Sequence, residues 1–402
     1  MLEEGLARMA VPRYRSVKAW PILSAGFRPF FLATGLWACI AMVLWLMILH
    51  GLIQLPTAFS PVAWHFHELV FGSVAAAIAG FLLTAIPNWT GRLPLQGWSL
   101  GSLLFLWLLG RVAVATSLWV GPAIAMMGDL TFLLVFLAVV SREIVAGRNW
   151  RNLPVVAAIA LLAAANALLH LGALGGATIE SLAREEAGKR LTISVVIMLI
   201  SLIGGRIIPS FTTNWLRRRQ AVRLPQPFGR YDRAILAFSA VVLSLWTIEG
   251  LNGVVGGGLM IAGGLHAVRM ARWRSVDTLR EPLIWILHLG YSWLAVGLAL
   301  LGAAAWLPGL ATQAIHALTV GAMGTMILAV MTRASLGHSK RELAAGGGTL
   351  LVYLLVTASA VARLIAGLVG DGYIVALDAA GAAWIAAFAL FVALYSPLYV
   401  RR

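Results

Sequence analysis

Long apolar segments are the feature of this sequence that most constrains its fold. Twelve such stretches carry few charged side chains, and a helix of about 20 apolar residues crosses the hydrocarbon layer of a membrane. The chain is 11% charged, against about a quarter for soluble domains. The segments lie near residues 28–50, 62–86, 99–120, 122–142, 154–174, 190–209, 232–251, 254–270, 282–305, 312–334, 346–368 and 373–396. The sequence therefore predicts an all-α polytopic membrane protein surrounded by the lipid bilayer.

Basic residues predict the orientation of these segments. Arginines and lysines precede the first segment and follow every even-numbered one, whereas the other side keeps only Arg184, Lys189, Arg190 and Arg363. The positive-inside rule then makes both termini cytoplasmic. The apolar run that begins near Phe30 is too long for a signal peptide and is interpreted as a first span. The net charge of +15 is dispersed over short loops, which argues against nucleic-acid binding.

A weak internal repeat relates the second, sixth and tenth segments. The positions that fall in register are Thr84 with Arg206 and Arg333, His67 with Lys189 and His316, Gly72 with Gly321, and Pro87 with Pro209. Internal repeats are common in membrane folds. We infer a basic N-terminal segment at 1–27 and one transmembrane domain at 28–400. The domain comprises three four-helix units, 28–150, 151–278 and 279–400, around a pseudo-threefold axis, each with its second helix inward.

Histidines within the apolar segments point to a metal or haem site. An imidazole is costly to bury in lipid, and in membrane proteins its lone pair is commonly given to a metal. Near the predicted outer ends lie His65, His67, His170 and His316. Near the cytoplasmic ends, His288 and His338 either bracket one haem iron or cap a propionate or a helix end. Cys39 is the one cysteine, so no CxxCH motif is present and any haem is held non-covalently.

The phrase WHFHE places two histidines and a carboxylate on one helical turn. His65 and His67 are two residues apart, so they point about 200° away from each other and cannot both bind one ion. One is expected to bind haem and the other a second metal or a hydrogen-bond partner. Glu68 is a candidate proton carrier, a partner that fixes a histidine tautomer, or half of a salt bridge. His50 and His266 lie at predicted helix ends near water and require no special role.

Three arginines lie within or at the inner ends of the apolar segments, namely Arg111, Arg206 and Arg333. A guanidinium binds a carboxylate in a fork, and haem carries two propionates. At least one of the three is expected to hold a propionate. The alternative is pairing with a carbonyl or carboxylate of a neighbouring helix.

Several phrases together resemble the NnrS family of bacterial membrane proteins. They are RPFFL (28–32), WHFHELVFG (64–72), GFLLTAIPNWTGR (80–92), LWLLGR (106–111), LHLGYSW (287–293) and HALTVGAMGTMILAVMTRASLGHSKREL (316–343). The resemblance implies a twelve-helix protein of the bacterial cytoplasmic (inner) membrane that contains haem b and copper and is linked to nitric oxide metabolism and denitrification. The family's characteristic histidines match His65, His67, His288, His316 and His338, and His170 less firmly. The arrangement also resembles haem–copper oxidases, but their paired adjacent histidines are missing.

The functional prediction follows from this resemblance. We expect a haem- and copper-containing protein that binds or turns over nitric oxide and relieves nitrosative stress. As an oxidoreductase it would take electrons from quinol or a periplasmic donor, with Glu68 moving protons. The alternative is a copper or metal transporter or insertion factor, which interrupted helices such as Gly204–Gly205 with Pro209 also suit. A haem-based sensor is disfavoured because the loops are short and no signalling domain is attached.

Overall fold

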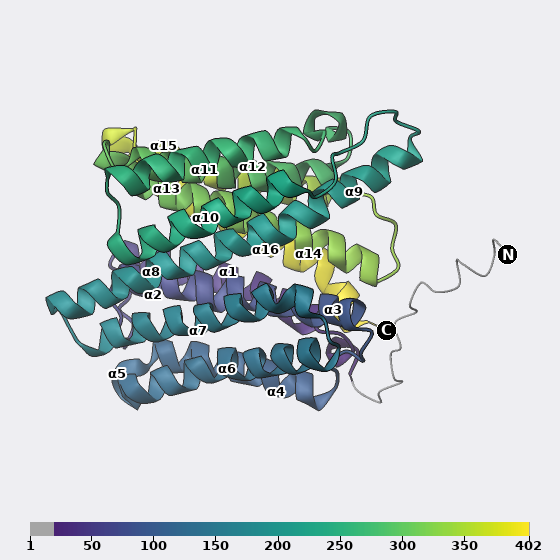
Figure 1. Ribbon diagram of the computed structural model, residues 1–402. Coiled ribbons are helices and arrows are strands. Elements are labelled where there is room, and N and C mark those ends of the chain that lie inside the picture. The colour runs from purple at the N-terminus through teal and green to yellow at the C-terminus, as the bar shows by residue number, and fades with distance from the viewer. Residues whose placement is uncertain (1–19, 402) are drawn as a thin grey trace.

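The protein forms a bundle of helices that run side by side (Figure 1). The structure, a computed structural model, describes residues 20–401, and no strand occurs in that range. Twelve of its helices are long and apolar enough to cross a membrane. The predicted all-α fold with twelve spans is therefore confirmed. The positive-inside orientation stays a prediction, and most of the basic segment 1–27 lies outside the described residues.

The second, fifth, sixth, tenth and twelfth spans are each built from more than one helical element. The spans are α1 (Phe27–Leu49); α2 (Pro61–His67), η2 (Glu68–Val74) and α3 (Ala75–Thr90); α4 (Trp98–Ala115); α6 (Pro122–Ala146); α7 (Leu153–Leu174); α8 (Ile179–Leu199), η4 (Ile200–Gly204) and α9 (Gly205–Arg218); α10 (Arg230–Glu249); α11 (Gly253–Ala271); α12 (Pro282–Ala303); α13 (Ala311–His316), η7 (Ala317–Gly324) and α14 (Thr325–His338); α15 (Gly347–Ala366); and η8 (Gly370–Gly372) with α16 (Tyr373–Val400). The fifth span begins with η3 (Trp150–Asn152) and the tenth with η6 (Pro308–Leu310). Three short elements connect or precede the spans, namely η1 (Pro21–Leu23), α5 (Ser117–Val120) and η5 (Ser275–Thr278).

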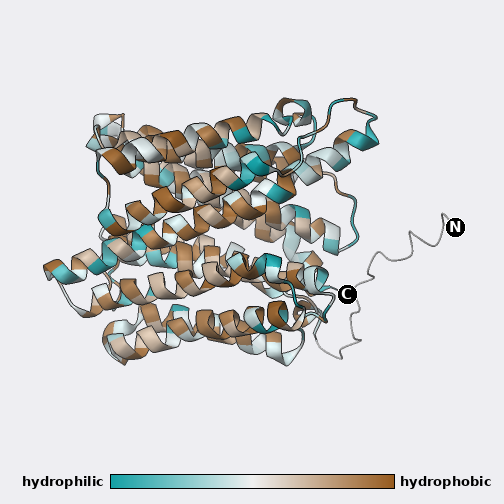
Figure 2. Ribbon diagram, in the orientation of Figure 1, coloured by the Kyte–Doolittle hydropathy of each residue, from teal (hydrophilic) through white to brown (hydrophobic). Residues whose placement is uncertain are grey.

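The sixth span is much longer than its apolar core. The sequence predicts a helix over 190–209, whereas the span covers 40 residues from Ile179 to Arg218. The Thr178 side chain caps its start by accepting a hydrogen bond from Ser181 N, and Lys189 pairs with Glu185 at 2.7 Å. Capping and ion pairs one turn apart stabilise helical turns without an apolar face. Hydropathy alone therefore underestimates the helix. Figure 2 shows such hydrophilic positions mostly towards the ends of the bundle.

Glycines let the eighth and ninth spans pack closely. A Cβ at Gly263 would lie 2.7 Å from Ala295 O, and one at Gly256 would lie 2.8 Å from Gly302 O. Small residues allow backbones to approach in membrane proteins, where lipid provides no hydrophobic drive for helix association. The glycine-rich sequence of the eighth segment is thus explained by the contact of α11 with α12.

The second, sixth and tenth spans form the inside of the bundle. In their apolar windows 72%, 67% and 72% of the residues are buried, more than in any other span of the described chain. The same three spans contain the π-helical segments η2, η4 and η7. Of these, η2 begins one residue after His67 and η7 one residue after His316. These features agree with an inward helix in each unit, and the three-unit repeat stays a prediction.

Candidate metal centre and histidine cavity

Buried polar side chains from four spans meet at one point. α2 begins at the end of the bundle opposite the C-terminus (Figure 1), and its last turn carries the histidine pair. Each of the six side chains in the cluster is at most 2% exposed. The charged cluster consists of His67 and Glu68 at the α2–η2 junction, Arg111 on α4, Asp129 on α6, and Asn166 and His170 on α7.

Asp129 lies at the centre of this charged cluster. Its Oδ2 lies 3.1 Å from His67 Nε2 and 3.2 Å from His170 Nε2, and it accepts a hydrogen bond of 2.7 Å from the amide of Asn166. One donor atom from each of His67, Asp129 and His170 lies within 4.8 Å of the other two. Ligands held about 2.1 Å from a tetrahedral metal ion lie about 3.4 Å apart. The three atoms therefore have the spacing of metal ligands.

The charges of the cluster do not balance when its histidines are neutral. Arg111 donates to Glu68 Oε1 at 2.7 Å and also pairs with Asp129. One guanidinium against two carboxylates leaves one negative charge. A buried charge without a partner costs several kcal/mol. The cluster therefore requires one further positive charge, which is a proton on a histidine or on Glu68, or a metal ion.

His67 shows where this cation belongs. Its Nδ1 lies 3.0 Å from Glu68 Oε1, and its Nε2 lies 2.8 Å from Asn166 Oδ1 as well as 3.1 Å from Asp129 Oδ2. When Nδ1–H donates to Glu68, the lone pair of Nε2 faces two acceptor oxygens. That contact is repulsive unless a positive centre lies between them. Glu68 thus combines two of its predicted roles, because it pairs with an arginine and orients a histidine ring.

Aromatic side chains close the cluster off. The Phe59 ring centroid lies 5.0 Å from that of His67 and 5.1 Å from that of His170, and the Phe71 ring lies 5.1 Å from His67. Within the described chain, Glu68 Oε2 and Arg111 Nε have no hydrogen-bond partner. The cluster is therefore shielded by aromatic rings and keeps one carboxylate oxygen that is placed to accept a proton.

Gly110 provides a test of how tightly the cluster is packed. A Cβ at this position would lie 2.6 Å from Asp129 Oδ1 and 3.1 Å from its Cα. We expect Gly110→Ala to displace Asp129 and to destabilise the protein by about 1–3 kcal/mol, the usual cost of overpacking. Thermal unfolding in detergent and the bound-metal content measure the effect. The matched control is Gly264→Ala, since a Cβ there meets nothing within 4 Å. Equal stability of the two variants would contradict the packing argument.

His65 points away from the charged cluster and lines a separate cavity. This histidine cavity has a volume of ≈ 450 Å³ and is also lined by His316. His65 stacks on Trp45 with ring centroids 4.2 Å apart, and its Nδ1 has no hydrogen-bond partner among the described residues. His316 Nδ1–H donates to Thr312 O at 2.8 Å. The Nε2 of His316 therefore keeps its lone pair.

Large apolar side chains and two cations surround these histidines. The walls come from α1, the second and tenth spans, α15 and α16. Lys189 and Arg363 also line the histidine cavity. The large apolar residues of its lining include Met42, Trp45, Phe66, Met323, Trp384 and Phe388. The cavity thus joins flat apolar walls, two imidazoles and groups that bind carboxylates.

The two histidines predicted near the cytoplasmic ends have different neighbours. His288 Nε2–H donates to Thr212 Oγ1 at 3.0 Å, and Nδ1 lies 3.0 Å from Ser275 Oγ. His338 is exposed, and its ring centroid lies 5.5 Å from that of Phe27. Both ring nitrogens of His288 are thus satisfied by hydroxyl groups. Haem ligation by this pair stays a prediction.

The three intramembrane arginines also have different neighbours. Arg111 pairs with two carboxylates of the chain, the interhelical alternative to propionate binding. Arg333 lies over the Phe211 ring at 4.1 Å, and Arg206 lies 6.0 Å from the Phe228 ring. No salt bridge joins Arg206 or Arg333 to a carboxylate within residues 20–401. Propionate binding by these two stays a prediction.

One prediction about the remaining histidines is wrong. His266 is expected near water, but it is fully buried. Its Nδ1 lies 2.8 Å from Tyr291 Oη and its Nε2 lies 3.0 Å from Ser239 Oγ. The helix continues five residues past it to Ala271, so His266 faces α10 and α12 rather than solvent. His50 does lie at a helix end, where it pairs with Asp378 at 2.8 Å.

The sequence prediction missed two members of the charged cluster. Asp129 lies inside the fourth apolar segment, and an ionisable residue within a span is by default a functional candidate. Asn166 is four residues before His170 on α7, a spacing that puts both on one helical face. The first signal, applied to every span, identifies Asp129, and the second identifies Asn166.

Comparison with known proteins gives a match over nearly the whole chain. The sequence model of one protein family, described as NnrS protein, matches residues 21–402. This match extends beyond the phrases found at 28–343 and includes α15 and α16, which carry no distinctive motif. No curated protein matches the chain.

Proposed function

The chain belongs to the NnrS family, and from this premise we propose a haem- and copper-containing inner-membrane protein that binds or turns over nitric oxide. One observation carries the proposal. His65 and His67 lie on one helical turn and face two different sites, a histidine cavity and a charged cluster. Each site offers what one of the two cofactors requires.

The charged cluster fits a copper ion. Imidazole nitrogens suit copper, iron and zinc, and a carboxylate adds an oxygen ligand. His67, His170 and Asp129 would hold the ion, with Glu68 orienting the ring of His67 through its other nitrogen. A singly charged copper ion neutralises the one negative charge left by Arg111, Glu68 and Asp129. This balance supports a bound cation in the charged cluster.

The histidine cavity fits a haem. Ligand pockets commonly measure about 300–1,000 Å³, and this one measures ≈ 450 Å³. His316 donates Nδ1–H to a carbonyl, as metal-bound histidines usually do, so its Nε2 is our first candidate to hold the iron. His65 is the second. Arg363 is placed to hold a propionate, whereas Lys189 already pairs with Glu185 and Glu186. Arg206 and Arg333 lie towards the other end of their spans and stay candidates for the propionates of a haem near His288 and His338.

The chemistry follows from the two sites together. A haem iron, when bound, binds nitric oxide and exchanges one electron. His65 and His316 orient the haem, the aromatic walls exclude water, and the free Oε2 of Glu68 is placed to accept a proton beside the charged cluster. Nitric-oxide-linked oxidoreductase activity would take its electrons from quinol or a periplasmic donor.

Transport of copper is the second candidate. It is favoured by the π-helical interruptions in the three inner spans, since interrupted helices form the binding sites of many transporters. This function requires metal that exchanges freely and no tightly held haem. Haem and copper analysis of one sample decides between the two functions.

Separate loss of the two cofactors is the expected result of histidine replacement. We expect His316→Gln to abolish the b-type Soret band and to keep copper, and His67→Gln to do the reverse. Absorption spectra of the oxidised and dithionite-reduced protein, with and without nitric oxide, and metal analysis measure both. His50→Gln is the control, because His50 lies at the surface beside Asp378. Retention of both cofactors in both variants would overturn the assignment.

A further inference from the structure

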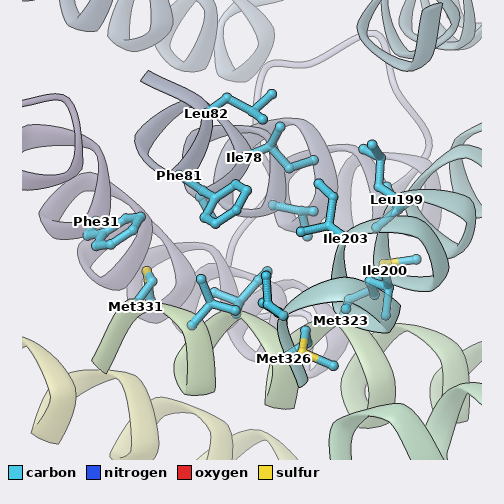
Figure 3. A pocket seen from close by; sticks show the side chains of 17 residues that line it. Phe31, Ile78, Phe81, Leu82, Leu199, Ile200, Ile203, Met323, Met326 and Met331 are labelled. Carbon is cyan, nitrogen blue, oxygen red and sulfur yellow. The ribbon is translucent and has the colours of Figure 1, made fainter. Parts of the chain in front are cut away.

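A second cavity lies where the three inner spans meet. Figure 3 shows its side chains, which come mainly from α3, from α8 and η4, and from η7 and α14, with Phe31 added from α1. The central cavity has a volume of ≈ 100 Å³. All of the 17 residues that line it are apolar; they include Phe31, Ile78, Phe81, Ile203, Met323 and Met326. No function described so far uses this space.

The lining decides what the central cavity holds. A buried water molecule needs two to four polar partners, and apolar cavities of about 150 Å³ stay dry and bind xenon or benzene. No side chain in the lining carries a hydrogen-bonding group or a charge, so water, anions and metal ions are disfavoured. The lining therefore favours a small uncharged molecule that forms no hydrogen bonds. A diatomic gas that dissolves in the bilayer has these properties.

The central cavity adjoins the histidine cavity. Val74, Met323 and Ile327 line both. These three side chains thus form the boundary between a space that suits an apolar gas and a space that contains two imidazoles. A molecule that leaves the central cavity past them enters the histidine cavity without crossing a polar region.

We propose that the central cavity binds a small uncharged gas and passes it to the histidine cavity past Val74, Met323 and Ile327. The identity of the gas, nitric oxide, rests on the proposed function, whereas the binding of an apolar gas does not. The central cavity then raises the local concentration of gas inside the bundle beside His65 and His316.

Xenon is the probe for this proposal, because it needs no haem or copper. We expect xenon-129 NMR of the purified full-length protein in lipid nanodiscs to show saturable binding. Ala77→Phe fills the central cavity from α3 and is expected to abolish this binding. The matched control is Ala164→Phe, an equal change at an exposed position of α7, which is expected to leave the binding unchanged. Ile203→Ala enlarges the central cavity and is expected to increase the xenon signal.

Three results would overturn the proposal. They are the absence of saturable xenon binding in the wild type, unchanged binding in folded Ala77→Phe, and an unchanged signal in Ile203→Ala. Native mass spectrometry that finds a lipid bound to the wild type and lost in Ala77→Phe would assign the space to an acyl chain instead. The absorption spectrum of the same samples reports haem independently, so failure of the proposed function is distinguished from failure of the gas site.

Discussion

Arg111→Met is expected to destabilise the protein by about 3–5 kcal/mol, the usual cost of removing one partner of a buried ion pair. Arg111 is 1% exposed and pairs with both Glu68 and Asp129. Without the guanidinium, the two buried carboxylates are balanced only by the one positive charge at His67. Size-exclusion chromatography and thermal unfolding in one detergent are expected to show little folded protein.

Two comparisons separate charge from packing at Arg111. Arg92→Met removes a surface pair with Glu143, and such exposed pairs contribute at most about 1 kcal/mol, so a small effect is expected there. The triple variant Arg111→Met/Glu68→Gln/Asp129→Asn removes all three charges and is expected to recover most of the lost stability. An equally unstable triple variant would show that the shape of Arg111, rather than its charge, supports the fold.

Asp129→Asn is expected to abolish metal binding in the charged cluster. The replacement keeps the size of the side chain but removes its charge and one ligand oxygen, which lies between His67 Nε2 and His170 Nε2. Replacing even a group that only orients a ligand costs 10–100-fold in metal affinity, and a direct ligand is expected to cost more. Elemental analysis after dialysis against a mild chelator measures the loss.

Asp378→Asn is the matched control for this replacement. Asp378 also faces a histidine, His50, but both side chains are at least 40% exposed. We expect this variant to keep its copper and haem. Copper retained in full by Asp129→Asn would contradict the metal site and would favour a proton on His67 as the cation of the cluster. Haem content is expected to stay unchanged in both variants.

The fold was largely predictable because a lipid environment permits few backbone structures. Every backbone polar group within a membrane must be satisfied, so long apolar segments form helices. This argument correctly predicts the glycine-rich span α11, whose composition alone does not favour a helix. It fails at Ile179–Arg218, where charged turns extend the helix beyond the apolar core. It fails again at His266, because depth along a helix does not reveal which face is buried.

The candidate sites were predictable in part. The spacing of His65 and His67 predicts opposite directions, and the structure places them in different sites. The partners of each histidine were less accessible, since Asp129, Asn166 and Arg363 come from spans far away in the sequence. Their contacts depend on how the helices pack, and hydropathy does not determine helix packing.

The π-helical segments set the direction of the histidines in two inner spans. A π turn holds more residues than an α turn, and η2 and η7 follow directly after His67 and His316. Removing one residue from either segment would turn the preceding histidines by about 100° around the helix axis. The extra residue of each π turn therefore sets the direction in which the histidines of Pro61–Thr90 and Pro308–His338 point.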